Sequence, residues 1–263
     1  MARAISTATI SFGLVSIPCK VYAASKADKI SFKTITKNGN TVKQQYVDAV
    51  TGEVHEREEG SKGYEYTKGK MVTFSPDELK EMESASDNSM EIVEFVPAEE
   101  IDSVHIEKSY FLGTAGNDKA YALLSRIMED EWVVAIAKWK ARGREHLVAI
   151  RPYQEGEAKG LVLQQLFYAN ERRSFAEHGV TDVEVSEKEL QLASQFVDQL
   201  RNMEGFQPRK YKDEYMCRVK TAIDQKVAGK CVNLPAPTKK DTSLDLFEAL
   251  QQSLSVAKKK IAG

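Results

Sequence analysis

The stretch VVAIAKWKARGREHLVAIR, residues 133 to 151, places two runs rich in Val, Ile and Ala on either side of an Arg-Gly pair. Arg142 and Gly143 fit a two-residue turn, because such turns favour glycine and join antiparallel strands. The turn fixes which residues face each other across the hairpin. The expected pairs are Trp139 with His146, Ala137 with Val148 and Ala135 with Ile150. They form one apolar face, which predicts a hairpin anchored in a core.

The opposite face of this hairpin gathers positive charge. Lys140 is expected to pair with Glu145, with Lys138 alongside, while Arg142 and Arg144 lie at the tip. The ordinary interpretation of one such cluster is a solvated turn. Further clusters at 172–173 and around Lys62, Lys68 and Lys70 favour phosphate binding instead. Cations on turns and strand faces, without a helix built for the major groove, predict nucleic-acid binding that is independent of sequence.

Other short alternating segments make the first 185 residues mainly β. They span 10–22, 30–36, 71–74, 91–96, 132–140, 145–151 and 161–168. Turn signals at 39–40, 51–52 and 68–69 divide residues 33–74 into hairpin-like pieces that are polar and carry almost no core. We expect this segment to be an excursion from the main body.

Two helices interrupt the β region, and both are expected to cover the sheet. Ser75, Pro76 and Glu78 form a capping box with proline at the first helical position. A second helix, from about 118 to 131, places apolar residues on one face. These residues are Tyr121, Leu124 and Met128.

After residue 185 the pattern becomes helical. Helices are predicted from the capping box Ser186 to Glu189 up to 205–208, and from about Tyr211 to Gly229. Their broad apolar faces have no neighbouring helical bundle in the chain, which suggests packing against a partner subunit. After a linker marked by Pro235 and Pro237, a last helix carries a narrow apolar seam. We interpret this seam as a docking element; the alternative is that it folds back on the same domain.

Composition bounds the class of protein. Hydrophobic residues make up 42%, the net charge is -2, and no apolar run approaches the roughly 20 residues of a membrane span. The first 20 residues read as a strand and not as a signal peptide, so we expect an intracellular protein. Charge is unevenly distributed along the chain: residues 77–102 contain ten acidic residues and a single basic residue, Lys80. Cys19, Cys217 and Cys231 are widely spaced, so neither disulfides nor a metal site is expected, and no cofactor is predicted.

Three segments resemble catalytic motifs, but each lacks residues that its motif requires. The glycine-rich segment 63–70 has five residues between its glycines and Met71 where a phosphate loop needs Ser or Thr. Residues 55–59 lack the second histidine of a metalloprotease helix. Residues 105–107 lack the downstream cysteines of a zinc deaminase. The sequence therefore predicts no enzyme.

Five motifs in order resemble bacterial Ku. They are ISFGLVSIP (10–18), KGYEY (62–66), EIVEFVPAEEID (91–102), KAYALL (119–124) and GREHLVAIRP (143–152). The match covers nearly the whole chain. The segment SLDLFEALQQSL (243–254) resembles the ligase-recruiting tail of that family.

The resemblance implies a β-barrel core with a long bridge that closes a ring in the homodimer, and a helical C-terminal arm. We expect the core at 1–185 with the bridge at about 33–74, the dimer arm at 186–231, and a linker and tail helix at 232–263. Such a protein threads onto double-stranded DNA ends in non-homologous end joining and recruits the ATP-dependent ligase D. It is expected in the cytoplasm, associated with the nucleoid and not with a membrane.

By resemblance to the basic channel of that family, together with the hairpin geometry, a set of cations is expected to contact DNA: Arg3, Lys62, Lys138, Lys140, Arg142, Arg144, Arg172 and Arg173. The expected ligase contacts are Leu246, Phe247, Leu250 and Leu254. The acids of 77–102 should lie mostly outside the channel, because carboxylates repel phosphates.

Two other functions stay open. A lyase would act on damaged DNA ends through a lysine Schiff base, although no lysine is marked out by its neighbours. A scaffold that binds only proteins would use the tail seam and leave the cationic hairpin without a role.

Overall fold

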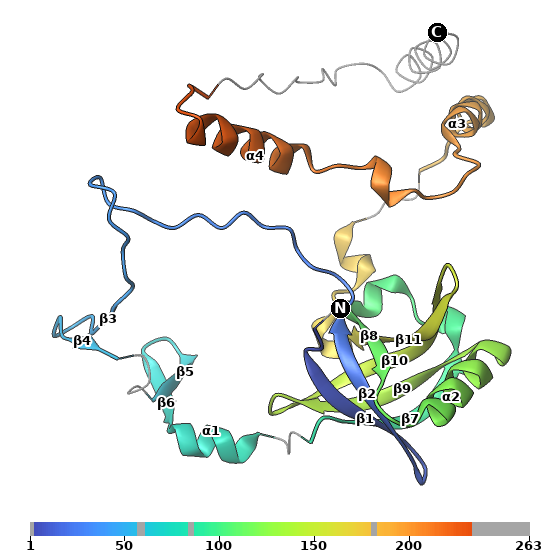
Figure 1. Cartoon of the computed structure of the whole chain (residues 1–263), viewed down its shortest axis with the longest axis horizontal. Coiled ribbons are helices and arrows are strands. Elements are labelled where there is room, and N and C mark those ends of the chain that lie inside the picture. The colour runs from blue at the N-terminus through green and yellow to red at the C-terminus, as the bar shows by residue number, and fades with distance from the viewer. Residues whose placement is uncertain (1–2, 57–60, 84–86, 180–182, 233–263) are drawn as a thin grey trace. The chain divides into compact units, whose positions relative to one another are not determined.

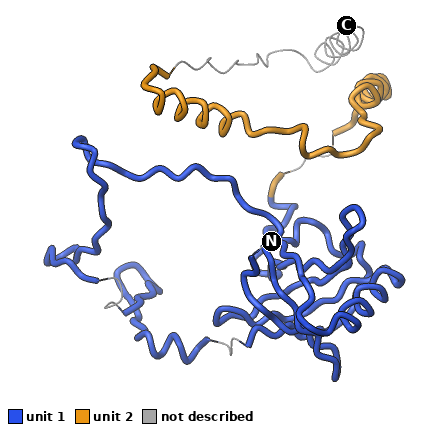
Figure 2. Tube along the Cα trace, viewed as in Figure 1, with its two compact units in different colours: residues 1–177 blue, residues 178–263 orange. Residues whose placement is uncertain are grey.

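The computed structural model describes residues 3–56, 61–83, 87–179 and 183–232. The chain divides into two compact units, residues 1–177 and 178–263 (Figure 2). The four expected ligase contacts in the tail lie outside the described residues.

A closed barrel of seven strands forms the core of the first unit (Figure 1). Neighbouring strands are antiparallel, except that β1 and β7 pair in parallel and so close the barrel. In spatial order the strands are β1 (Ser6–Phe12), β2 (Val15–Ala23), β8 (Ile106–Thr114), β11 (Ala158–Leu166), β10 (Arg144–Glu155), β9 (Val133–Ala141) and β7 (Ser89–Pro97). The prediction of a mainly β fold with a barrel core is confirmed.

Helix α2 (Asp118–Asp130) packs against the barrel with Tyr121, Leu124 and Met128 buried, as predicted. The Tyr121 hydroxyl accepts a hydrogen bond from the Leu161 amide at 2.7 Å and donates one to the Leu112 carbonyl. It thereby links α2 to two barrel strands.

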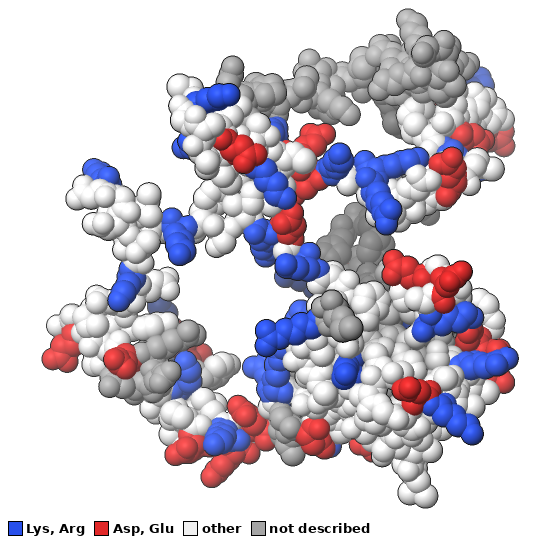
Figure 3. Space-filling view, in the orientation of Figure 1, with Lys and Arg blue, Asp and Glu red and all other residues white. Residues whose placement is uncertain are grey.

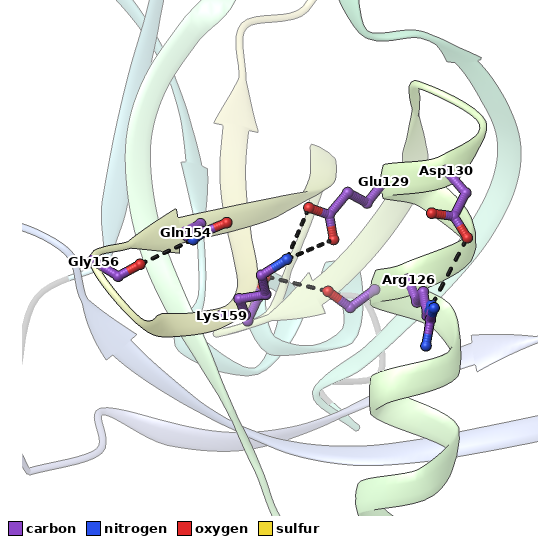
Figure 4. A network of polar contacts seen from close by, with 8 residues as sticks. Arg126, Glu129, Asp130, Gln154, Gly156 and Lys159 are labelled. Carbon is purple, nitrogen blue, oxygen red and sulfur yellow. Dashed lines mark hydrogen bonds and ion pairs between the residues drawn. The ribbon is translucent and has the colours of Figure 1, made fainter.

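The outer face of α2 carries an ionic contact to the barrel (Figure 4). Lys159 on β11 lies 3.2 Å from Glu129 of α2. On the helix itself, Arg126 lies 4.0 Å from Asp130, one turn further on. These pairs are exposed, so each contributes little stability, on the order of 0.2–1 kcal/mol.

Three strand predictions differ from the structure. Residues 10–22 form two strands and not one, because Gly13 with φ +57° turns the chain between β1 and β2. Residues 30–36 form no strand; Ile35 makes only an isolated bridge to Thr41. Strand β8 was missed, because its sequence IEKSYFLGT lacks clear alternation.

Between β2 and β7 the chain forms the predicted hairpin-like pieces. β3 (Tyr46–Val47) pairs with β4 (Val54–His55), and β5 (Lys62–Thr67) with β6 (Lys70–Phe74). Helix α1 (Pro76–Met82) follows with its capping box in place: the Ser75 side chain accepts from the Glu78 amide. None of the described residues from 33 to 73 is buried, which agrees with the expected lack of core.

The second unit contains α3 (Glu187–Leu200) and α4 (Glu214–Val227). Ser186 and Glu189 form the predicted capping box. Neither helix has a buried residue. Short 3-10 helices complete the chain at Ala98–Glu100, Ser103–His105, Ala169–Glu171, Phe175–His178 and Pro208–Lys210.

Two general properties concern membranes and thiols. Of the helices that the structure describes, none is long and apolar enough to cross a membrane. Cys19 is buried, and burial raises the pKa of its thiol to about 11. Cys217 and Cys231 are exposed thiols.

Candidate nucleic-acid interface

The hairpin of β9 and β10 has the predicted register. Trp139 is the partner of His146, Ala137 of Val148 and Ala135 of Ile150. The turn residues Arg142 and Gly143 have φ of +54° and +76°. Two consecutive positive φ values define the tight turn whose twist matches that of the strands.

The inner face of the hairpin is anchored in the barrel. Trp139 is only 7% exposed, and its ring lies edge-on to Tyr110 with centroids 5.7 Å apart. The centroid of the His146 ring lies 5.8 Å from that of Trp139. The Nδ1 atom of His146 lies 3.2 Å from the side-chain amide nitrogen of Gln165. Because this face is packed, the opposite face is held in a fixed position.

We call Lys138, Lys140, Arg142 and Arg144 the cationic hairpin. Both arginines are exposed at the turn, and the Lys138 side chain is 50% exposed. Glu145 is the strand partner of Lys140, as expected, but its carboxylate forms an ion pair with Lys138 at 3.3 Å. The pairing is therefore diagonal, which long side chains on adjacent strands permit.

A further cation, Lys108 on β8, escaped the sequence analysis. Its side chain is 58% exposed and lies 2.7 Å from Glu107. Its pKa is raised by the hydrogen bond and charge of Glu107, while the charge of Arg142 acts in the opposite direction. Lys108 therefore lies within electrostatic range of the hairpin tip. Lys108 was not predicted as a candidate cation, because β8 was not recognised as a strand.

Arg172 belongs to a segment that lies beside the hairpin. Tyr168 donates a hydrogen bond to the Glu145 carbonyl at 3.2 Å, which fixes the chain after β11 next to the start of β10. Arg172 donates to the His105 ring nitrogen Nε2 at 2.9 Å. A hydrogen bond from the Val104 amide lowers the pKa of Asp102, and Ser103, His105 and Arg172 add to the effect.

The other predicted cations are exposed but separate. Arg3 precedes β1, Lys62 begins β5, and Arg173 follows Arg172. Within the described ranges, no ion pair or side-chain hydrogen bond joins these three residues to the cationic hairpin. They stay predictions for DNA contact.

Glu91 and Asp87 of the acid-rich segment 77–102 lie close to the lysines of the hairpin. Glu91 on β7 is the strand partner of Lys138. Hydrogen bonds from Ser89 lower the pKa of Asp87, and the positive charge of Lys140 lowers it further. Figure 3 shows basic and acidic side chains gathered next to one another on the barrel. That the acids of 77–102 lie mostly outside a DNA channel stays a prediction, and these two lie beside cations of the hairpin.

An apolar groove lies at the other end of β9. Its volume is about 530 Å³, and it is lined by α2, the β1–β2 hairpin and β7 through Phe12, Val15, Phe95, Leu123 and Ile127, among others. Next to it, Trp132 is 80% exposed. An apolar surface of this kind on a folded domain usually contacts another protein.

Metal binding can be judged for the parts of the chain that the structure describes. No group of three His, Cys, Asp or Glu side chains there is arranged to hold a metal ion.

The sequence is similar to those of known proteins. Residues 11–192 match the model of the Ku70/Ku80 beta-barrel domain. A Paraburkholderia phymatum protein named non-homologous end joining protein Ku is 38% identical over 259 residues, covering 96% of this chain and 83% of its own. Proteins of the same name from Koribacter versatilis and Bacillus subtilis are 36% and 34% identical, covering 98% and 94% of this chain and 88% and 79% of their own lengths. The barrel and these matches together show that the chain belongs to the Ku family.

Proposed function

We propose that this protein binds the ends of double-stranded DNA without regard to sequence, as a component of non-homologous end joining with no catalysis of its own. The observation that carries the proposal is the cationic hairpin. Its arginines are exposed at a tight turn, and Trp139 anchors its other face in the barrel. The anchored backbone presents the cations together on one face, and phosphate contacts supply affinity for every sequence alike. The names of the relatives support the same pathway.

We further propose that two copies form a ring around the duplex. The first unit would supply the barrel, with residues 33–74 as the bridge, and residues 186–231 would form the dimer arm. The helices of the second unit support this proposal, because α3 and α4 expose large apolar residues that water solvates poorly. On α3 these are Leu190, Val197 and Leu200, and on α4 they include Tyr215 and Val227. The apolar groove of the barrel is a second surface that needs a partner.

Residues 232–263 would form the linker and the tail that recruits ligase D. Support comes from the sequence pattern alone: Leu246, Phe247, Leu250 and Leu254 repeat at helical spacing. One apolar stripe of this kind fits a groove on a partner protein.

The decisive experiment compares linear duplex DNA with covalently closed circles of the same sequence in an equilibrium binding assay. A threading ring binds the linear form and not the circle. The two forms differ only in having ends, so composition and length are controlled. Equal affinity for both would contradict end binding while leaving general DNA binding intact.

A further inference from the structure

Three carboxylates of the segment that leads from α1 into β7 lie along the cationic hairpin. We call Glu83, Asp87 and Glu91 the acidic edge. Glu91 is the strand partner of Lys138, and the neighbouring pair is Met90 with Trp139. Because β7 and β9 are antiparallel, residues that precede Met90 lie toward the hairpin tip. Asp87 is thereby brought toward Lys140, and Glu83 lies further along in the same direction.

Glu83 lies directly against the turn. A Cβ atom at position 143 would be 2.7 Å from Glu83 Cδ and 2.8 Å from its Oε2. Real Cβ atoms do not approach that closely, so the Glu83 side chain would have to shift if residue 143 carried a Cβ atom. Arg142 and Arg144, both exposed, flank this position. A carboxylate therefore already lies against the turn, at the residue between the two arginines in sequence.

We propose that the acidic edge occupies the phosphate subsites of the cationic hairpin in the free protein, and that the DNA backbone displaces it. The inference rests on the proposed DNA binding. It goes further by naming the groups that occupy the hairpin before DNA binds. The ligand class is a phosphodiester chain. A carboxylate and a phosphate oxygen both accept hydrogen bonds and carry negative charge, so they compete for the same groups.

Displacement has a consequence for selectivity. Each exposed carboxylate is weakly held, but all three must be displaced together for a continuous backbone to lie along the strand. A ligand with a single phosphate gains too little to displace them, whereas a polymer with regularly spaced phosphates gains several contacts at once. The acidic edge would therefore lower the affinity for isolated anions and for short nucleotides.

The test neutralises the acidic edge without removing its hydrogen-bonding atoms. The variant E83Q/D87N/E91Q is compared with E99Q/E100Q/E157Q, which changes the net charge equally. Glu99 and Glu100 follow Pro97, whose partner Val133 is at the far end of β9. Glu157 lies in the β10–β11 turn, about 35 Å along β10 from its start at Arg144. The single change E83Q tests the turn alone.

Affinity for a linear duplex is measured at about 0.15 M salt, where charges beyond about 8 Å are screened. We expect the acidic-edge variant to bind about tenfold more tightly than the unmodified protein, E83Q about threefold, and the control less than about threefold. Thermal unfolding verifies that all variants fold. Equal tightening by the two triple variants would overturn the inference while leaving DNA binding intact. Failure of the unmodified protein to bind DNA would overturn the proposed function itself.

Discussion

Trp139 and His146 face each other across the β9–β10 hairpin, with ring centroids 5.8 Å apart on the inner side of the barrel. The alternation of the strand then places Lys138 and Lys140 on the outer side. Burial of one indole ring thus determines where the cations lie. The stability of the barrel and the position of the proposed DNA contact depend on the same residue.

Trp139→Ala should lower the free energy of unfolding by about 3–5 kcal/mol, because it leaves a cavity at a buried aromatic position. Urea denaturation followed by circular dichroism measures this change. The matched control is Trp132→Ala, since Trp132 is 80% exposed and has a positive φ of 54°. That control should change stability by less than about 1 kcal/mol. Similar losses at the two positions would contradict the anchoring role of Trp139.

Arg142→Glu with Arg144→Glu should weaken binding to every duplex sequence alike. If the dimer neutralises eight phosphates, log K should fall against log salt with a slope of about -7, and loss of four contacts should bring it to about -4. Fluorescence anisotropy across a salt series measures both quantities. The control is Arg126→Glu with Lys159→Glu, which reverses two charges in the network of Figure 4. If the variant lost affinity for only some DNA sequences, binding through phosphate contacts would be contradicted.

Local sequence signals predicted much of this fold, whereas contacts between segments far apart in the sequence could not be predicted from them. The hairpin register followed from alternation around Arg142 and Gly143, and the capping boxes at Ser75 and Ser186 followed from short-range chemistry. The parallel pairing of β1 with β7 joins segments about 80 residues apart, and no local pattern encodes it. No local pattern encodes the close approach of Glu83 to Gly143 either. The position of the acidic edge was therefore not predictable from the charge pattern.

The three thiols should react at different rates. Cys217 and Cys231 are exposed, whereas Cys19 is buried with its pKa raised to about 11. A thiolate-specific reagent at pH 8 should modify two thiols rapidly and the third only after unfolding. Because the raised pKa favours the protonated thiol in the folded state, the associated stability is complete below pH 9 and is lost as the pH rises through about 11. Rapid modification of all three thiols in the folded protein would contradict the burial of Cys19.

Leu190→Asp with Val197→Asp should convert the proposed dimer to monomers. Both residues are exposed and lie two turns apart on one face of α3. Placing carboxylates there would require their desolvation in an interface. Sedimentation equilibrium measures the molecular mass. Gln191→Asp with Gln195→Asp is the control, because these residues lie on the opposite side of the helix and should leave the dimer intact. A dimer that survives the first pair would exclude this face of α3 from the interface.

Truncation after Asn233 should separate DNA binding from ligase recruitment. The cationic hairpin lies in the first unit, so the shortened protein should bind linear duplex with unchanged affinity. It should no longer stimulate ligation by ligase D, because the expected ligase contacts are removed: Leu246, Phe247, Leu250 and Leu254. End-joining assays with purified ligase measure the stimulation. Leu250→Asp with Leu254→Asp in the full chain distinguishes loss of the apolar seam from loss of chain length. Since desolvating a carboxylate in an apolar groove is costly, the point variants should behave like the truncation, and unchanged stimulation by either protein would refute the recruitment role.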